Sequence, residues 1–203
     1  MKTFTQLSLE SYLNELSSAE PIPVGGSAAA YTASLAMGLT QMVGRVSLKR
    51  KKKAGLSAQD EAAEDGRRNS IQTIIDSVEK AKRDAFKIVD ADPAAYEKVL
   101  QVSGQPEKVE QALLESFQVQ ADLGFLIVMA QKWNAQMKSL VSGSIKNDLL
   151  VADSFLKASF DAAYHTAHIN VVYFKDETAK QRSEKILSEM KSAFEKELTH
   201  AGA

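Results

Sequence analysis

The sequence contains no cysteine among its 203 residues. This absence excludes disulfide bonds, thiolate nucleophiles and cysteine-ligated metal centres, and it is typical of proteins in a reducing compartment. No uninterrupted apolar run approaches the roughly 18 residues of a membrane-spanning helix, and the first residues lack the apolar core of a secretory signal. We therefore expect a cytoplasmic protein that does not insert into a membrane.

An excess of either charge is also missing, because 25 Lys and Arg residues are balanced by 26 Asp and Glu residues for a net charge of −1. Such a balance argues against a dedicated binder of nucleic acid or anionic membranes. Hydrophobic residues make up 44% of the chain, and together with its length this composition predicts one globular domain over residues 1–203.

Proline is scarce, and all four prolines lie at or before Pro106, so the second half of the chain has no helix-breaking ring. The sequence shows neither strand-like alternation nor an internal repeat. It therefore predicts an all-α bundle of about six to eight helices. The expected helices cover residues 8–18, a segment that opens at Ser27, 57–89, a short helix that begins at Pro93 with Asp92 as its cap, 107–143, 147–176 and 177–198.

Two glycines and a serine precede the most apolar of these helices. Gly25 and Gly26 permit positive φ and close approach of a ligand to the backbone, and Ser27 is a suitable helix cap. The free amides of such a helix end favour an anionic or carbonyl-bearing ligand. A tight turn before a buried, alanine-rich helix is the structural alternative.

Three ordered segments resemble the cyclodeaminase/cyclohydrolase family, which includes the cyclodeaminase domain of formiminotransferase-cyclodeaminase and methenyltetrahydrofolate cyclohydrolase. The segments are residues 10–30 with the Pro-x-Pro-x-Gly-Gly-Ser-Ala-Ala-Ala string, residues 89–96, and residues 147–171. The resemblance covers roughly residues 8–176. The sequence departs from the family pattern at Val24, where a third glycine is usual, at Asn147, and at residues 166–168.

The resemblance implies an all-helical homodimer that acts on a tetrahydrofolate derivative and needs no metal or redox cofactor. Two reactions fit: the expulsion of ammonia as formiminotetrahydrofolate closes to the methenyl form, and the addition of water to that methenyl carbon. A carboxylate of tuned pKa near the carbon could stabilise its charge and carry a proton. A catalytically silent folate-binding or regulatory protein of the same fold is the alternative.

Four residues are candidates for the proton-transfer role. Asp148 comes first, because it lies at a helix start inside a family-like segment, although a first-turn aspartate is also favoured by the helix dipole. Asp90 and Asp92 are alternatives, since one of two neighbouring acids can have a raised pKa. His168 could act as an acid or base near neutral pH, or it could be an ordinary core or surface histidine.

The candidate substrate-binding residues are the glycine turn and three polar side chains. We expect the substrate near Gly25, Gly26 and Ser27, with Asp148 and Asn170 beside it. The Asn170 amide could bind the pterin ring or another helix. The basic run 49–53, and Lys51 and Lys52 in particular, could bind the glutamate tail of a folate, or it could be a solvated surface.

A metal site is the third hypothesis. Asp161, His165 and His168 share one helix face, a spacing that can bring ligands together. No second motif completes a coordination shell, so we predict that the protein holds no metal.

Overall fold

The computed structural model describes residues 3–52 and 55–201, which form one short 3₁₀ helix, η1 (Phe4–Gln6), six α-helices and no strand. The all-α prediction is therefore confirmed for this part of the chain. The α-helices are α1 (Leu9–Leu16), α2 (Gly25–Lys49), α3 (Ala58–Gln101), α4 (Pro106–Leu140), α5 (Lys146–Tyr173) and α6 (Glu177–Ala201).

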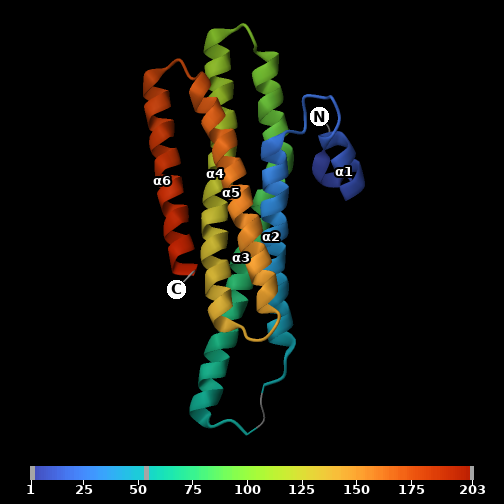
Figure 1. Ribbon diagram of the computed structural model, residues 1–203, viewed down its shortest axis with the longest axis vertical. Coiled ribbons are helices and arrows are strands. Elements are labelled where there is room, and N and C mark those ends of the chain that lie inside the picture. Colours follow the sequence, from blue (N-terminus) through green and yellow to red (C-terminus); the bar gives the residue numbers. More distant parts are fainter. Residues whose placement is uncertain (1–2, 53–54, 202–203) are drawn as a thin grey trace.

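The long helices α2 to α5 run side by side as a bundle, with α6 on the outer side of α4 and α5 (Figure 1). Helix α1 lies beside the bundle, at the end where α2 begins (Figure 1), and its Tyr12 packs against α2. Helix α2 packs against both α3 and α5. Its alanines Ala29, Ala30, Ala33 and Ala36 are buried, so the predicted burial of this helix is confirmed.

Close packing in the bundle depends on residues without large side chains. At Gly44 of α2, an added methyl group would lie 2.8 Å from Cε of Met137 in α4 and 2.9 Å from Cγ1 of Ile75 in α3. Met137 and Ile75 are themselves buried, which leaves them little room to move. Glycine at this position therefore sets how closely three helices approach.

The predicted break between residues 89 and 93 is wrong, because α3 continues through Pro93 to Gln101. A proline inside a helix leaves the carbonyl four residues earlier without its amide partner. That carbonyl belongs to Val89, and the Ser27 hydroxyl donates a hydrogen bond to it at 2.8 Å. A residue 62 positions away thus compensates for the proline, and Asp92 is an internal helix residue rather than a cap.

The cap predictions have mixed outcomes. Ser8 caps α1 as expected, accepting a hydrogen bond from the Ser11 amide at 3.1 Å. Ser27 is not a cap, because α2 begins at Gly25 and its N-cap is Val24. Neither Gly25 nor Gly26 has positive φ, so the conformational reason for these glycines is also wrong.

By length and composition, one of the described helices could cross a membrane: α4 contains an 18-residue window of mean hydropathy 1.3. Of that window, 56% is buried inside the bundle, and a core helix passes the same test. The prediction of no membrane span rests on the absence of a long uninterrupted apolar run. The mean hydropathy of a window can still be high when the window includes polar residues, such as the glutamines and the aspartate of α4.

Replacing Gly44 by alanine should lower the free energy of unfolding by about 1–3 kcal/mol, because the new methyl group overpacks the core. The matched control is Gly66→Ala, at an exposed helical site where an added methyl group meets no described atom within 4 Å. This control should gain up to about 1 kcal/mol from helix propensity. Urea denaturation measures both, and equal effects of the two substitutions would contradict the packing account.

Candidate functional site

A buried acid and a buried amide meet beside the start of α2. Asp92 of α3 is 2% exposed and Gln120 of α4 is fully buried, and the Gln120 Nε2 donates to Asp92 Oδ1 at 2.7 Å. An added methyl group on Gly26 would lie 2.6 Å from Asp92 Cγ and would also collide with Gln120. Gly26 is therefore needed for the close approach of these two side chains of the same chain, whereas the sequence suggested close approach of a ligand.

The pair has unused hydrogen-bonding capacity. Across residues 3–52 and 55–201, no partner is found for Asp92 Oδ2 or Gln120 Oε1, although both atoms are buried. Two neighbouring acceptors without a donor are costly in a protein interior. A proton on Asp92, or a donor group of a ligand, would relieve that cost.

Burial raises the pKa of the Asp92 carboxyl to about 6, and the hydrogen bonds from Gln120 and from the Ser27 backbone amide oppose the shift. One amide of the first turn of α2, that of Ser27, therefore points at an acid of the same chain, Asp92. A carboxyl with a pKa in this range exchanges its proton near neutral pH, as general acid–base chemistry requires.

Tyr12 adds a hydroxyl that the sequence analysis did not select. Its oxygen lies 3.0 Å from Ser27 Oγ, and its ring stacks on Tyr31 with 5.0 Å between ring centroids. Burial raises the pKa of Tyr12, so the phenol stays protonated at neutral pH. Tyr12 thus fixes Ser27, whose backbone contacts Asp92.

Asp90 has a structural role in this arrangement. Its Oδ1 accepts hydrogen bonds from the amides of Phe4 at 2.5 Å and Thr5 at 3.1 Å, and its Oδ2 accepts one from the Thr5 hydroxyl at 2.5 Å. These bonds attach η1 to α3. Asp90 therefore holds the segment that leads to Tyr12, and its acceptors are already in use.

Asn170 lies at the same level of the bundle as the acid–amide pair. It is 7% exposed, and its Nδ2 donates to the Thr166 carbonyl at 2.9 Å. One turn further along α5, the Phe174 ring contacts the Phe117 ring with centroids 6.3 Å apart. Phe117 precedes Gln120 by one turn of α4, which places Asn170 near the height of Gln120.

His168 does not join this group. Its side chain is exposed and stacks on the ring of Tyr164, with centroids 6.2 Å apart. Asp161 and His165 are exposed as well. Within the described part of the chain, no set of three or more His, Asp or Glu side chains is arranged to hold a metal ion.

Asp148 lies at the opposite end of the bundle from Asp92. The loop before it contacts the end of α2, where the Arg50 guanidinium donates to the Ser142 carbonyl at 3.0 Å. Gly26 begins the same helix, and the intervening turns measure about 35 Å at 1.5 Å per residue. The expected convergence of Asp148 with the glycine turn and Asn170 is therefore wrong within one chain.

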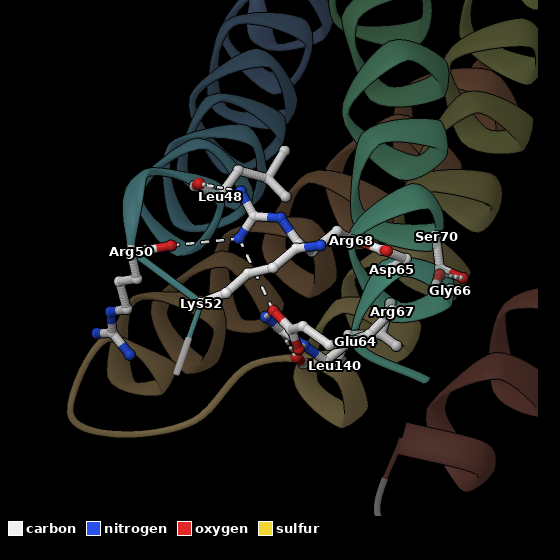
Figure 2. A network of polar contacts seen from close by, with 10 residues as sticks. All are labelled: Leu48, Arg50, Lys52, Glu64, Asp65, Gly66, Arg67, Arg68, Ser70 and Leu140. Atoms are coloured by element: carbon white, nitrogen blue, oxygen red, sulfur yellow. Dashed lines mark hydrogen bonds and ion pairs between the residues drawn. The ribbon is translucent and has the colours of Figure 1, made fainter. Parts of the chain in front are cut away.

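Lys51 and Lys52 lie at the Asp148 end, where they line a pocket of about 550 Å³. Figure 2 shows the polar network beside it: Arg68 donates to the carbonyls of Leu48 and Arg50, and Lys52 forms an ion pair with Asp65. Arg50 and Arg67 line this pocket too, against the two acids Asp60 and Glu64, so positive charge is in excess there.

The family model described as formiminotransferase-cyclodeaminase matches residues 8–189. The chain belongs to this family. The formimidoyltransferase-cyclodeaminase of Sus scrofa is 26% identical over 199 residues, which are 91% of this chain and 35% of that protein. The chain thus spans about a third of that relative's length. The formiminotetrahydrofolate cyclodeaminase of Thermotoga maritima, solved by crystallography, shares the fold with a TM-score of 0.86 at 21% identity, over 97% of this chain and 94% of that one.

Asp92→Asn should stabilise the protein at neutral pH. Because the folded state raises this pKa from 3.8 to about 6, wild-type protein should lose about 3 kcal/mol of stability as pH rises from about 4 to 7. Asparagine has no such titration, and its amide can donate to Gln120 Oε1. Urea denaturation at several pH values measures the difference, and the substitution Asp76→Asn, at an exposed site of the same helix, should leave the wild-type slope intact. An unchanged slope in Asp92→Asn would assign the titration elsewhere.

Proposed function

We propose that this chain is a folate one-carbon enzyme in which Asp92 moves the proton. The observation that carries the proposal is the buried Asp92–Gln120 pair beside Gly26, in a member of the formiminotransferase-cyclodeaminase family. The carboxyl has a pKa of about 6 and an unused oxygen, so it can both accept and donate a proton. Gly25 is exposed, and an added methyl group there meets no described atom within 4 Å, so the substrate can approach over this residue.

The same carboxyl serves both candidate reactions. In the cyclodeaminase reaction, N10 of formiminotetrahydrofolate attacks the formimino carbon, and the N10 proton passes to the formimino nitrogen. Asp92 gives that nitrogen a second proton, its bond to the carbon breaks, and ammonia departs from the methenyl cation. In the cyclohydrolase reaction, water adds to the methenyl carbon and Asp92 takes one of its protons. That proton passes to N5 as the bond between N5 and the carbon breaks, and the remaining hydroxyl proton is released to solvent as the formyl C=O forms. The names of both relatives favour the cyclodeaminase reaction, and neither reaction requires a metal or another cofactor.

We also propose a homodimer, which would give Asp148 a role. Neighbouring helices α2 and α5 expose an apolar face with Leu35 at 51%, Val151 at 37% and Phe155 at 37% exposure. A two-fold axis across the middle of this face would reverse the second copy. Asp148, Lys51 and Lys52 of the second copy would then approach the Asp92 end of the first copy. The two lysines could bind glutamates at the far end of a folate tail.

Purified protein should convert formiminotetrahydrofolate to the methenyl form with release of ammonia. The absorbance of the methenyl chromophore follows the reaction, and Asp92→Asn should slow it by at least about a hundredfold because the proton carrier is gone. Adding methenyltetrahydrofolate instead tests the hydrolysis. Silence of the wild-type protein in both assays, with a measured affinity for folate, would favour the binding-protein alternative.

Mixing two inactive variants tests the shared site. If Asp148 of one copy completes the site of the other, a heterodimer of Asp92→Asn and Asp148→Asn subunits has one intact site out of two. Subunit exchange on mixing makes about half of the dimers heterodimers, so the mixture should regain about a quarter of wild-type activity. Phe155→Glu should abolish both the dimer and the rescue, as followed by light scattering. The control Leu13→Glu changes an exposed leucine of α1 and should leave the dimer intact. A monomeric wild-type protein would overturn the arrangement.

A further inference from the structure

The hydrogen bond between Gln120 and Asp92 lies directly against the backbone of α2. Gln120 Nε2 donates to Asp92 Oδ1 at 2.7 Å, and an added methyl group on Gly26 would collide with both of these atoms. The bond therefore has no room to shift toward α2, and both side chains are at most 2% exposed. In a site packed this closely, the amide fixes the rotation of the carboxyl about its last side-chain bond.

This arrangement makes the two oxygens of the Asp92 carboxyl unequal. Oδ1 accepts the Gln120 amide hydrogen, whereas no partner is found for Oδ2 across residues 3–52 and 55–201. A proton binds most readily where the lone pairs are unused, so Oδ2 is the atom that takes it up and releases it. If the amide were turned over, Gln120 Oε1 would face Oδ1 and two acceptors would meet.

A second buried glutamine of α4 shows the same contact without a free carboxyl oxygen. Gln131 is fully buried, its Nε2 donates to Asp153 Oδ1 at 3.1 Å, and its own Oε1 has no partner among the described residues. Asp153, however, also accepts a hydrogen bond from Asn134 at 2.6 Å and forms an ion pair with Lys138 through Oδ2. Both of its oxygens are in use and its charge is neutralised, so this acid–amide pair is structural.

Asp92 has no such compensation. Within the part of the chain that the structure describes, no cationic side chain pairs with it, and its carboxyl is contacted by the amides of Gln120 and Ser27. We propose that Gln120 is a positioning residue, which anchors Asp92 Oδ1 so that Oδ2 carries the proton. This inference rests on the proposed function, in which Asp92 gives a proton to the leaving nitrogen or takes one from water. Gln120 itself exchanges no proton.

The titration of Asp92 tests the anchor without an assay of activity. A donor bonded to the ionised carboxyl favours that form, so Gln120→Met, which is close in size and donates nothing, should raise the pKa of Asp92 from about 6 by about one unit. The ¹³C resonance of the Asp92 carboxyl, identified by its absence from Asp92→Asn, follows the titration. Gln131→Met is the matched control and should leave the pKa unchanged. The same pKa in Gln120→Met and wild type would overturn the anchor.

Gln120→Glu keeps the shape of the side chain and provides the test if the methionine variant does not fold. A second carboxyl at this position opposes ionisation of the first, so the pair should hold one proton to higher pH than wild-type Asp92 does. The same ¹³C resonance reports the shift. A titration that stays at the wild-type midpoint would contradict the contact between the two side chains.

Steady-state kinetics separates the positioning role from the proposed reaction. Gln120→Met should lower kcat about tenfold and leave KM within about twofold, because the carboxyl no longer holds Oδ2 in place. Deamination needs protonated Asp92, so its loss of rate at high pH should also move upward by about one unit. Wild-type kcat in Gln120→Met, or an equal loss in Gln131→Met, would refute the positioning role and leave the proposed function standing. A raised Asp92 pKa in Gln120→Met, in a protein whose wild type turns over neither folate, would support the anchor and refute the function.

Discussion

The hydrogen bond from Ser27 to the Val89 carbonyl is the contact on which the rest of the site depends. Pro93 frees that carbonyl by lacking an amide hydrogen, and Ser27 satisfies it at 2.8 Å. The bond fixes the first turn of α2 against the C-terminal third of α3. As a result, Gly26 lies against Asp92 and Gln120, and the Ser27 amide reaches the Asp92 carboxyl. The Val89 carbonyl, left free by Pro93, thus fixes the position of α2 relative to α3 and to Asp92.

The acid itself is unfavourable for folding and therefore requires another explanation. A carboxyl that is 2% exposed, with one oxygen unpaired in the described structure, destabilises the ionised form. An asparagine or a leucine would avoid this cost. Proteins tolerate such groups where function needs a perturbed pKa, so the local instability supports a chemical role for Asp92. Asp90, in the same helix, is the contrasting case: both of its carboxylate oxygens accept hydrogen bonds from residues of η1, so its role is structural.

Local sequence patterns predicted the helices well and the site only in part. Hydrophobic periodicity and the Ser8 cap gave the helix bounds to within a few residues, except at Pro93, where the compensating group is 62 positions away. Sequence reasoning did not select Gln120, because a single amide side chain in an apolar helix belongs to no local motif. Its place as a polar residue on the buried face of that helix is the signal that could have found it. Nothing in the local sequence around Tyr12 distinguishes its hydroxyl from that of any tyrosine on a short helix. The distance between Asp148 and Asp92 follows from the helix directions, which no local pattern contains.

The length of the helices constrains how the family-like segments can cooperate. The segments around Gly26, Asp92 and Asn170 lie at one level of the bundle, whereas Asp148, in the first turn of α5, lies near the far end of α2, whose length is about 35 Å. Straight, packed helices cannot bend to close such a distance within one chain. If both levels act on one substrate, a second, reversed copy must supply Asp148, and the exposed apolar face of α2 and α5 is where that copy would pack. If only one level acts, the Asp92 end has the buried acid and amide pair with the glycine packed against it.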